Sequence, residues 1–372
     1  MKDTILFGDC KETLSAFLPQ SARTCVTSPP YYGLRDYGTA TWIGGDPNCK
    51  HRKVGKQGSN CITGHKNHDD MGSVGDYIFK SVCPLCGAVR QDSQIGLEES
   101  PEEYVESLVN VFRSVRDVLT DDGTLWVNLG DSYYNYRPGK GQSYPKQSVS
   151  KTKQDLPDEC NKRGKKLDGL KEKDLIGIPW LFAFAMRKDG WYLRQDIIWH
   201  KPNPMPESVR DRCTKSHEYI FLFSKNRKYF YNNEAIKEPA KDWGTRDRTN
   251  GKYHNTGTGL QPHSGLSKSY PTKNKRSVWS VTVKPYKEAH FATYPPDLIE
   301  PCILAGSEEG DTILDPFMGA GTTAAVAKSL NRYYIGCELN EDYGNLIQKR
   351  IQDYHPVKEV AQEPTINILD II

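Results

Sequence analysis

The segment that most restricts the fold lies near the C-terminal end of this 372-residue chain. Apolar Thr312–Leu314 runs into the loop Asp315–Thr323, which reads Asp-Pro-Phe-Met-Gly-Ala-Gly-Thr-Thr and opens a helical segment. A second apolar segment, Tyr333–Cys337, ends directly before Glu338. Strand, small-residue loop, helix and strand in this order are typical of a parallel sheet covered by helices. We therefore predict an α/β fold with a Rossmann-like core and a mostly parallel, twisted sheet.

Hydrophobic periodicity elsewhere predicts the same alternation of strands and helices. Strands are predicted at Thr4–Asp9, Thr24–Thr27, Thr124–Leu129, Leu193–Trp199 and Glu218–Ser224. Helices are predicted at Cys10–Leu18, Pro101–Leu119, Pro179–Lys188 and Gly319–Ser329, with a turn at Asp121–Gly123. Two polar segments interrupt the pattern: an insertion at residues 44–94, and a loop at residues 137–173 that we expect to be mobile.

The loop Asp315–Thr323 has the features of a nucleoside site. Its small residues let the backbone approach a ligand, and the N-terminus of the following helix offers free N–H groups. Glu338, at the tip of the next strand, stands where a Rossmann-like site holds ribose hydroxyls. The two glycines alone would fit ordinary helix–strand packing equally well, but Asp315 before them and Glu338 after them favour a nucleoside.

A second loop, Thr27–Gly33, follows another predicted strand and reads Thr-Ser-Pro-Pro-Tyr-Tyr-Gly. Two consecutive prolines restrict φ and remove two N–H donors, so the backbone is stiff and presents carbonyl acceptors. Ser28 adds an acceptor, and Tyr31 and Tyr32 add rings. Acceptors beside a stacking ring suit a planar ligand that carries an amine. The alternative is a Pro-Pro turn with surface tyrosines.

Together, the two loops resemble those of the S-adenosylmethionine-dependent amino-methyltransferases of DNA. Their catalytic tetrapeptide is Ser/Asp/Asn-Pro-Pro-Tyr, and their cofactor loop is Asp-Pro-Phe-x-Gly-x-Gly-Thr-Thr. The order, with the catalytic loop first and the cofactor loop last, is similar to that of the circularly permuted β group. The resemblance covers about two-thirds of the chain, because it extends to Gly8–Cys10, Gly123–Ser132, Leu193–Pro202 and His290–Pro295.

The resemblance implies a Rossmann-like methyltransferase core and a role for each matching residue. The implied catalytic residues are Ser28, Pro29, Pro30 and Tyr31. The implied cofactor contacts are Asp9, Thr27, His290, Phe291, Thr293, Asp315, Pro316, Phe317, Gly319, Gly321, Thr322, Thr323 and Glu338. The implied division of the chain is a catalytic half of the core (1–43 and 95–235), the insertion (44–94), a small irregular target-recognition region (236–288) and a cofactor-binding half (289–372).

The reaction that the resemblance implies is methyl transfer to the exocyclic amino nitrogen of a base flipped out of the duplex. Tyr31 would stack on the base, while Ser28 and the Pro29 carbonyl accept hydrogen bonds from its amino group. Ser at position 28 is associated with cytosine-N4 enzymes, so a DNA (cytosine-N4-specific) methyltransferase is the first expectation and adenine-N6 methylation the alternative. Methylation of RNA or of protein glutamine, and DNA binding without catalysis, are further alternatives. The two intact loops argue against the last of these.

Four cysteines in the insertion cluster with histidines. Cys83 and Cys86 have the two-residue spacing with which thiolates bind one tetrahedral metal ion. The best second pair is Cys49 and His51, with Cys61, His65 and His68 in reserve. We predict a structural Zn²⁺ that orders the insertion. Reduced surface thiols are the alternative, and a redox role is disfavoured because no thioredoxin-like helix follows.

Residues 237–287 contain 11 Lys and Arg against 3 Asp and Glu, with aromatic residues between them. Such a segment can contact phosphates and, through its polar side chains, base edges. Double-stranded DNA is therefore the expected partner, and the candidate contacts are Arg246, Arg248, Lys275 and Arg276. The formal net charge of +3 is too small to indicate a nucleic acid by itself.

The remaining composition argues against a membrane protein. Mean hydropathy is −0.68, and no apolar run approaches the ~18 residues of a membrane helix. The N-terminal residues lack the pattern of a signal peptide. We expect a soluble, cytoplasmic protein of prokaryotic or phage origin, with a cognate restriction endonuclease as a further partner.

Overall fold

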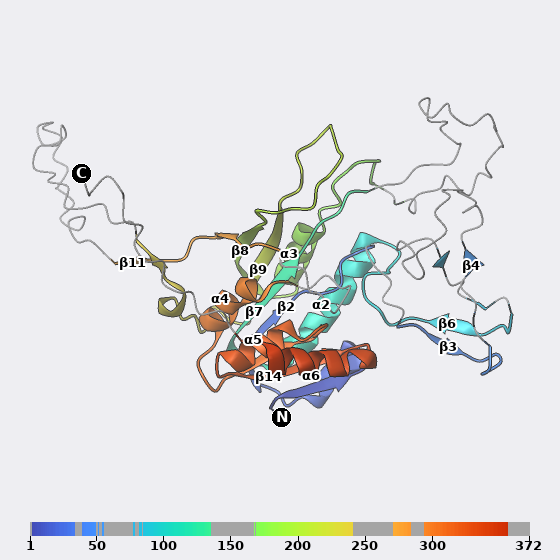
Figure 1. Ribbon diagram of the computed structural model, residues 1–372, viewed down its shortest axis with the longest axis horizontal. Helices are drawn as coiled ribbons and strands as arrows, with labels where there is room; N and C mark the ends of the chain where they lie inside the picture. The colour runs from blue at the N-terminus through green and yellow to red at the C-terminus, as the bar shows by residue number, and fades with distance from the viewer. Residues whose placement is uncertain are drawn as a thin grey trace, which may run out of the picture.

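The structure, a computed structural model, describes residues 2–33, 39–49, 51, 54–55, 77–78, 82–83, 85–134, 167, 169–240, 271–283 and 294–355. Eight strands form the main sheet (Figure 1). Their order is β1 (Thr4–Phe7), β14 (Tyr333–Glu338), β13 (Thr312–Asp315), β2 (Ala22–Thr27), β7 (Leu119–Leu129), β9 (His217–Ser224), β8 (Tyr192–His200) and β12 (Val278–Ser280).

The sheet is mixed but mostly parallel, as predicted. Only β9 runs against its neighbours, β7 and β8, and the other five pairings are parallel. The strands that precede the two predicted loops, β2 and β13, are adjacent. Because the carboxyl ends of parallel strands meet at one edge of a sheet, this order brings the two loops together.

Helices cover both faces of the sheet. α2 (Pro101–Val118) and α3 (Ile178–Lys188) share one apolar core with the short α1 (Cys10–Thr13) and η1 (Leu14–Ala16). The second core takes in α4 (Pro296–Gly306), α5 (Thr322–Ser329) and α6 (Gly344–Asp353), together with η3 (Glu234–Ile236). A further 3₁₀ turn, η4 (Glu341–Tyr343), precedes α6.

Local sequence explains where α2 begins. Ser100 is extended, and its side chain accepts a hydrogen bond from the Glu103 N–H, while Pro101 occupies the first turn, where its missing N–H is not needed. The predicted helix at residues 319–329 instead begins at Thr322. Gly319 and Gly321 both have positive φ, at 54° and 80°, which keeps this part of the loop out of the helix.

The turn predicted at Asp121–Gly123 is wrong, because β7 continues through these residues from Leu119. The pairing of β7 with β2 shifts register between Ala22 and Thr24, so the extra residues are absorbed as an irregularity within the strand.

Three small sheets lie outside the main one. They pair β3 (Thr41–Ile43) with β6 (Val89–Gln91), β4 (Val54–Gly55) with β5 (Tyr77–Ile78), and β10 (Glu238–Pro239) with β11 (Thr272–Lys273). β3, from the predicted core segment 1–43, therefore pairs with a strand of the predicted insertion. β12, from the predicted recognition region, instead joins the main sheet beside β8. Most of the polar loop predicted at residues 137–173 lies outside the described residues.

In the part of the chain that the structure describes, every helix is too short or too polar to cross a membrane.

Candidate active site

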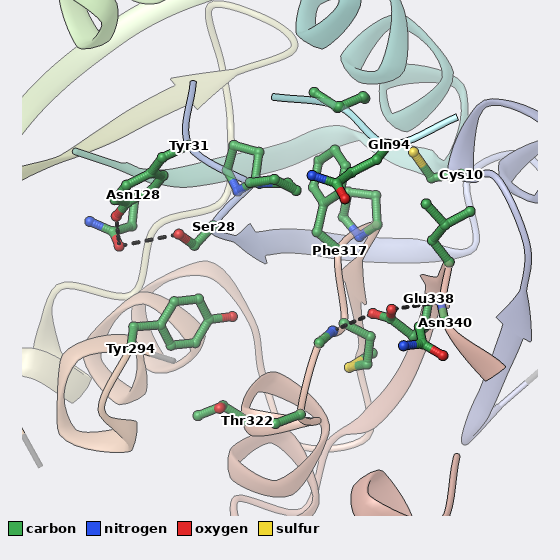
Figure 2. A pocket seen from close by; sticks show the side chains of 18 of the residues that line it. Cys10, Ser28, Tyr31, Gln94, Asn128, Tyr294, Phe317, Thr322, Glu338 and Asn340 are labelled. Atoms are coloured by element: carbon green, nitrogen blue, oxygen red, sulfur yellow. Dashed lines mark hydrogen bonds between the residues drawn. The ribbon is translucent and has the colours of Figure 1, made fainter. Parts of the chain in front are cut away.

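A cavity of about 280 Å³ opens where β2, β13 and β14 end (Figure 2). The loop after β2 lines it with all four predicted catalytic residues, Ser28, Pro29, Pro30 and Tyr31. Predicted cofactor contacts line it as well, namely Asp9, Pro316, Phe317, Gly319, Thr322 and Glu338. The two loops recognised separately in the sequence therefore form one site.

Glu338 holds the end of β14 against the loop after β13. One oxygen of its carboxylate accepts a hydrogen bond from the Gly319 N–H at 2.7 Å, and the other accepts one from the Asn340 N–H at 2.9 Å. Burial raises the pKa of Glu338 to about 7, against the lowering effect of these two N–H donors. The carboxyl group therefore lies at the cavity wall with its orientation set by backbone groups.

Asp315 does not line the cavity. Its carboxylate is completely buried and accepts hydrogen bonds from the Thr27 hydroxyl at 2.6 Å, the Phe317 N–H at 3.0 Å and the Tyr294 hydroxyl at 3.1 Å. The Thr323 hydroxyl is a fourth donor. Burial raises the pKa of Asp315, while these donors lower it. Asp315 is thus the shared acceptor that joins the base of the two loops.

Four predicted cofactor contacts are absent from the cavity wall: Thr27, Asp315, Gly321 and Thr323. Three of them take part instead in the buried group around Asp315, so their direct contact with a cofactor stays a prediction. Gly321 has another role. A Cβ at this position would lie 2.8 Å from Cγ2 of Ile347 on α6, so the small residue is required by helix packing.

The rigid loop after β2 is held from several sides. The Tyr104 hydroxyl, from α2, donates to the Pro30 carbonyl at 2.8 Å, and the Gly33 N–H donates to the Gly96 carbonyl at 2.8 Å. The ring of Tyr31 lies against Gly130, where a Cβ would be 2.5 Å from the ring. The cavity wall therefore presents a fixed aromatic ring beside Ser28.

Sequence reasoning missed a polar group behind Ser28 and Tyr31. Asn128 on β7, Glu218 on β9 and Lys201 after β8 all line the cavity, and Glu218 and Lys201 form an ion pair. Trp199 and Tyr294 were also missed as lining residues. Polar residues inside strand-like apolar segments, as at Asn128 and Glu218, are the signal that could have found them, because a buried polar group requires partners.

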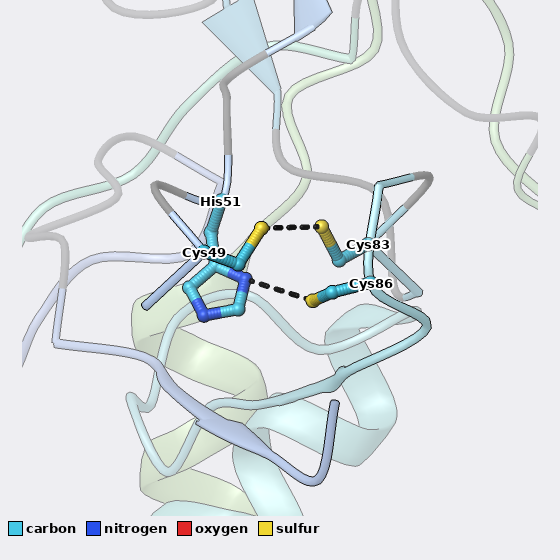
Figure 3. A group of neighbouring side chains, drawn as sticks. All are labelled: Cys49, His51, Cys83 and Cys86. Atoms are coloured by element: carbon cyan, nitrogen blue, oxygen red, sulfur yellow. Dashed lines mark hydrogen bonds between the residues drawn. The ribbon is translucent and has the colours of Figure 1, made fainter. Parts of the chain in front are cut away.

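The side chains of the four residues predicted to bind the metal form one cluster (Figure 3). The ligand atoms of Cys49, His51, Cys83 and Cys86 all lie within 4.8 Å of one another. The sulfur atoms of Cys49 and Cys83 are 3.9 Å apart, and Nδ1 of His51 is 3.6 Å from the Cys86 sulfur. The reserve candidates Cys61, His65 and His68 lie outside the described residues.

The hairpin that carries this cluster continues directly into the cavity wall. After β6, the chain supplies Ser93, Gln94 and Ile95 to the wall. Gly96 then pairs with Gly33, and its Cα lies so close to the loop after β2 that a Cβ would be 3.0 Å from the Tyr31 carbonyl oxygen. The insertion is therefore connected to the catalytic loop through the segment 92–96.

The other predicted contacts are only partly described. His290, Phe291, Thr293, Arg246 and Arg248 lie outside the described residues. Lys275 and Arg276 both pair with Glu238, with nitrogen-to-oxygen distances of 3.8 Å and 3.3 Å. The side chain of Arg276 is 75% exposed and that of Lys275 only 23%, so Arg276 is the more accessible of the two.

Comparison with known proteins gives one consistent result. The family model described as DNA methylase, of the N6/N4 type, matches residues 22–349. The chain is 38% identical over 349 residues to the type II methyltransferase M.Cfr9I of Citrobacter freundii, covering 94% of this chain and 87% of that protein. It is 39% identical over 352 residues to the type II methyltransferase M.SmaI of Serratia marcescens, covering 93% and 90%.

A solved structure shows the same fold. The PvuII DNA methyltransferase, described as cytosine-N4-specific, aligns with a TM-score of 0.53 at 15% identity, over 96% of this chain and 88% of that one.

Proposed function

This chain belongs to the DNA methylase family, and from that premise we propose that it methylates N4 of a cytosine flipped out of duplex DNA. It is S-adenosylmethionine-dependent, as this family is. One observation carries the proposal: the loop with Ser28 and the loop with Gly319 open into a single cavity. A donor nucleoside and a target base can therefore meet without either loop moving far.

The residues around Glu338 fit the nucleoside part of S-adenosylmethionine. A carboxylate oriented by two backbone N–H groups keeps lone pairs that can accept from ribose hydroxyls, and Phe317 offers an apolar surface to the adenine. Asp9 lies nearby at the N-terminus of α1. When bound, the cofactor supplies an electrophilic methyl group to the amino nitrogen, which loses one proton as the new bond forms.

Ser28, the Pro29 carbonyl and Tyr31 form the base site in this proposal. The serine hydroxyl and the proline carbonyl accept hydrogen bonds from the amino group, which directs the nitrogen lone pair out of conjugation with the ring. Tyr31 stacks on the base, a contact worth about 1–3 kcal/mol in other complexes. Positioning, rather than a strong base, supplies most of the catalysis.

Cytosine is preferred over adenine because position 28 is serine, the residue associated with cytosine-N4 enzymes in this family. The related fold of a methyltransferase described as cytosine-N4-specific agrees with this choice. We also propose that the chain belongs to the β group, since Ser28 precedes the predicted cofactor loop in the sequence.

The direct test is to methylate duplex DNA of diverse sequence with the purified protein and isotopically labelled S-adenosylmethionine, and to identify the product nucleoside by mass spectrometry. We expect labelled N4-methylcytosine. Labelled N6-methyladenine would support the family reaction but show that the target base is adenine and not cytosine. The absence of any labelled nucleoside would contradict the proposed activity.

The Cys/His cluster supports a second proposal, that Cys49, His51, Cys83 and Cys86 bind one structural Zn²⁺. Three thiolates and one imidazole are an established zinc ligand set, and one ion placed between them would satisfy all four. Elemental analysis of the purified protein should find about one zinc per chain, and this should fall in Cys83→Ser but not in Cys213→Ser, an exposed cysteine far from the cluster in sequence. A metal-free preparation that is fully folded would contradict the site.

The segment 236–288 is proposed as the target-recognition region, with Arg246, Arg248, Lys275 and Arg276 as contacts to duplex DNA. The type II names of the relatives agree with a cognate restriction endonuclease as a partner.

A further inference from the structure

Glu218 is a partly buried acid that the proposed reaction leaves without a role. Its side chain is 14% exposed, and its Oε1 pairs with the ammonium group of Lys201, which is 19% exposed. The Lys201 ammonium also lies 4.3 Å from the centre of the Trp199 ring. In this ion pair, the Glu218 carboxylate acts as a hydrogen-bond acceptor for its other neighbours.

The second oxygen of Glu218 determines how Asn128 is oriented. Nδ2 of Asn128 lies 3.2 Å from Oε2 of Glu218 and 3.1 Å from the Tyr219 carbonyl oxygen. Both neighbours are acceptors, so the amide nitrogen must face them, and the amide oxygen Oδ1 must face the cavity. The reversed amide would place its oxygen against two acceptors.

This orientation of the Asn128 amide determines the direction in which the Ser28 hydroxyl donates its hydrogen bond. Ser28 Oγ lies 3.4 Å from Asn128 Oδ1 and therefore donates its proton to that oxygen (Figure 2). Tyr31 has a nearer acceptor, because its hydroxyl is 2.7 Å from Glu218 Oε2 and 3.1 Å from Asn128 Oδ1. With its proton directed away from the cavity, Ser28 is left with lone pairs for the amino hydrogens of a base.

We propose that Glu218 is a positioning residue that acts through Asn128 and Tyr31 to present Ser28 as a hydrogen-bond acceptor. The proposal rests on the function proposed above and goes beyond it, because it explains why Ser28 accepts rather than donates. If Glu218 could donate a hydrogen bond, only the Tyr219 carbonyl would still hold the Asn128 amide nitrogen, and the amide could reverse at the cost of that one bond. Its nitrogen would then donate to Ser28, and the serine proton would be directed at the base amino group, a donor.

The test is a double-mutant cycle between Glu218→Gln and Ser28→Ala, read as the single-turnover rate of methyl transfer to duplex DNA. Glutamine keeps the shape and gains a donor. We expect Glu218→Gln to slow transfer about 10- to 100-fold, with the dissociation constants for S-adenosylmethionine and DNA changed less than about twofold. In the Ser28→Ala background, Glu218→Gln should cause little further loss, because both changes remove the same interaction.

Asp211→Asn is the matched control, since it also converts an acid to an amide in an ion pair with a lysine, at an exposed position. It should leave the rate unchanged. If Glu218→Gln does not fold, as judged by circular dichroism and thermal melting, Asn128→Ala takes its place in the cycle with the same expectation.

Multiplicative losses in the double variant would overturn the proposal, because Glu218 would then act independently of Ser28. Equal weakening of cofactor binding would also overturn it. A wild-type protein that methylates no DNA would instead show that the proposed function has failed, so the two failures are distinct.

Discussion

The Thr27 hydroxyl donates a hydrogen bond to the buried Asp315 carboxylate at 2.6 Å, which joins the last residue of β2 to the last residue of β13. The two loops that follow these residues both line the cavity. The relative position of the two loops thus depends on a contact between residues that do not line the cavity.

Asp315→Asn should therefore impair the protein through stability. The four neighbours of this carboxylate all donate to it, and an amide nitrogen in place of one oxygen removes both an acceptor and the negative charge that they share. We expect the free energy of unfolding to fall by about 1–3 kcal/mol, with weaker cofactor binding as a consequence. Chemical denaturation measures the stability and calorimetry measures the binding, with Asp353→Asn, at an exposed position at the end of α6, as the control. If Asp315→Asn weakened cofactor binding without lowering the free energy of unfolding, Asp315 would instead be a direct contact of the cofactor.

Gly130→Ala should separate methyl transfer from cofactor binding. The new Cβ would lie 2.5 Å from the Tyr31 ring, which must then move. Since Tyr31 belongs to the base site, we expect the single-turnover rate to fall about tenfold or more, while the affinity for S-adenosylmethionine stays within about twofold of wild type. Isothermal titration provides the internal control, and an unchanged rate would show that the position of Tyr31 does not limit the reaction.

The affinity for S-adenosylmethionine should depend on pH near neutrality. Burial raises the pKa of Glu338 to about 7, so the free protein carries this group protonated at lower pH. Ribose hydroxyls donate to the ionised form, and binding below the pKa therefore requires proton release. Affinity should fall about tenfold between about pH 8 and about pH 6. Glu338→Gln should bind more weakly and lose this dependence, and a pH-dependent Glu338→Gln protein would assign the titration to another group.

Removal of the proposed zinc should affect the cavity as well as the insertion. The cluster lies on the hairpin that continues into residues 93–95, which line the cavity, and into Gly96, which pairs with Gly33 of the loop after β2. We expect chelator treatment, or Cys86→Ser, to lower both cofactor affinity and methyl transfer, and added Zn²⁺ to restore the chelated protein. Cys213→Ser treated in parallel should behave as wild type. Full activity of a zinc-free protein would show that the metal affects only the insertion and not the cavity.

Much of the site could be predicted from the sequence because its signals are local. The strands before Ser28 and before Gly319 are apolar runs of a few residues, and each loop follows its strand directly. The pair Cys83 and Cys86 is equally local, as is the N-terminus of α2 at Ser100. Each of these features depends on backbone conformation or spacing within one short segment, which neighbouring residues largely decide.

The tertiary structure decided what depends on the order of strands in the sheet. Asn128 and Glu218 are 90 residues apart and meet only because β9 runs antiparallel to β7. Asp315 reads in the sequence as a cofactor contact, yet the adjacency of β2 and β13 surrounds it with hydroxyl groups and buries it. Strand order and register arise from packing across the whole core, so no local pattern specifies which polar group faces a ligand and which one holds the loops together.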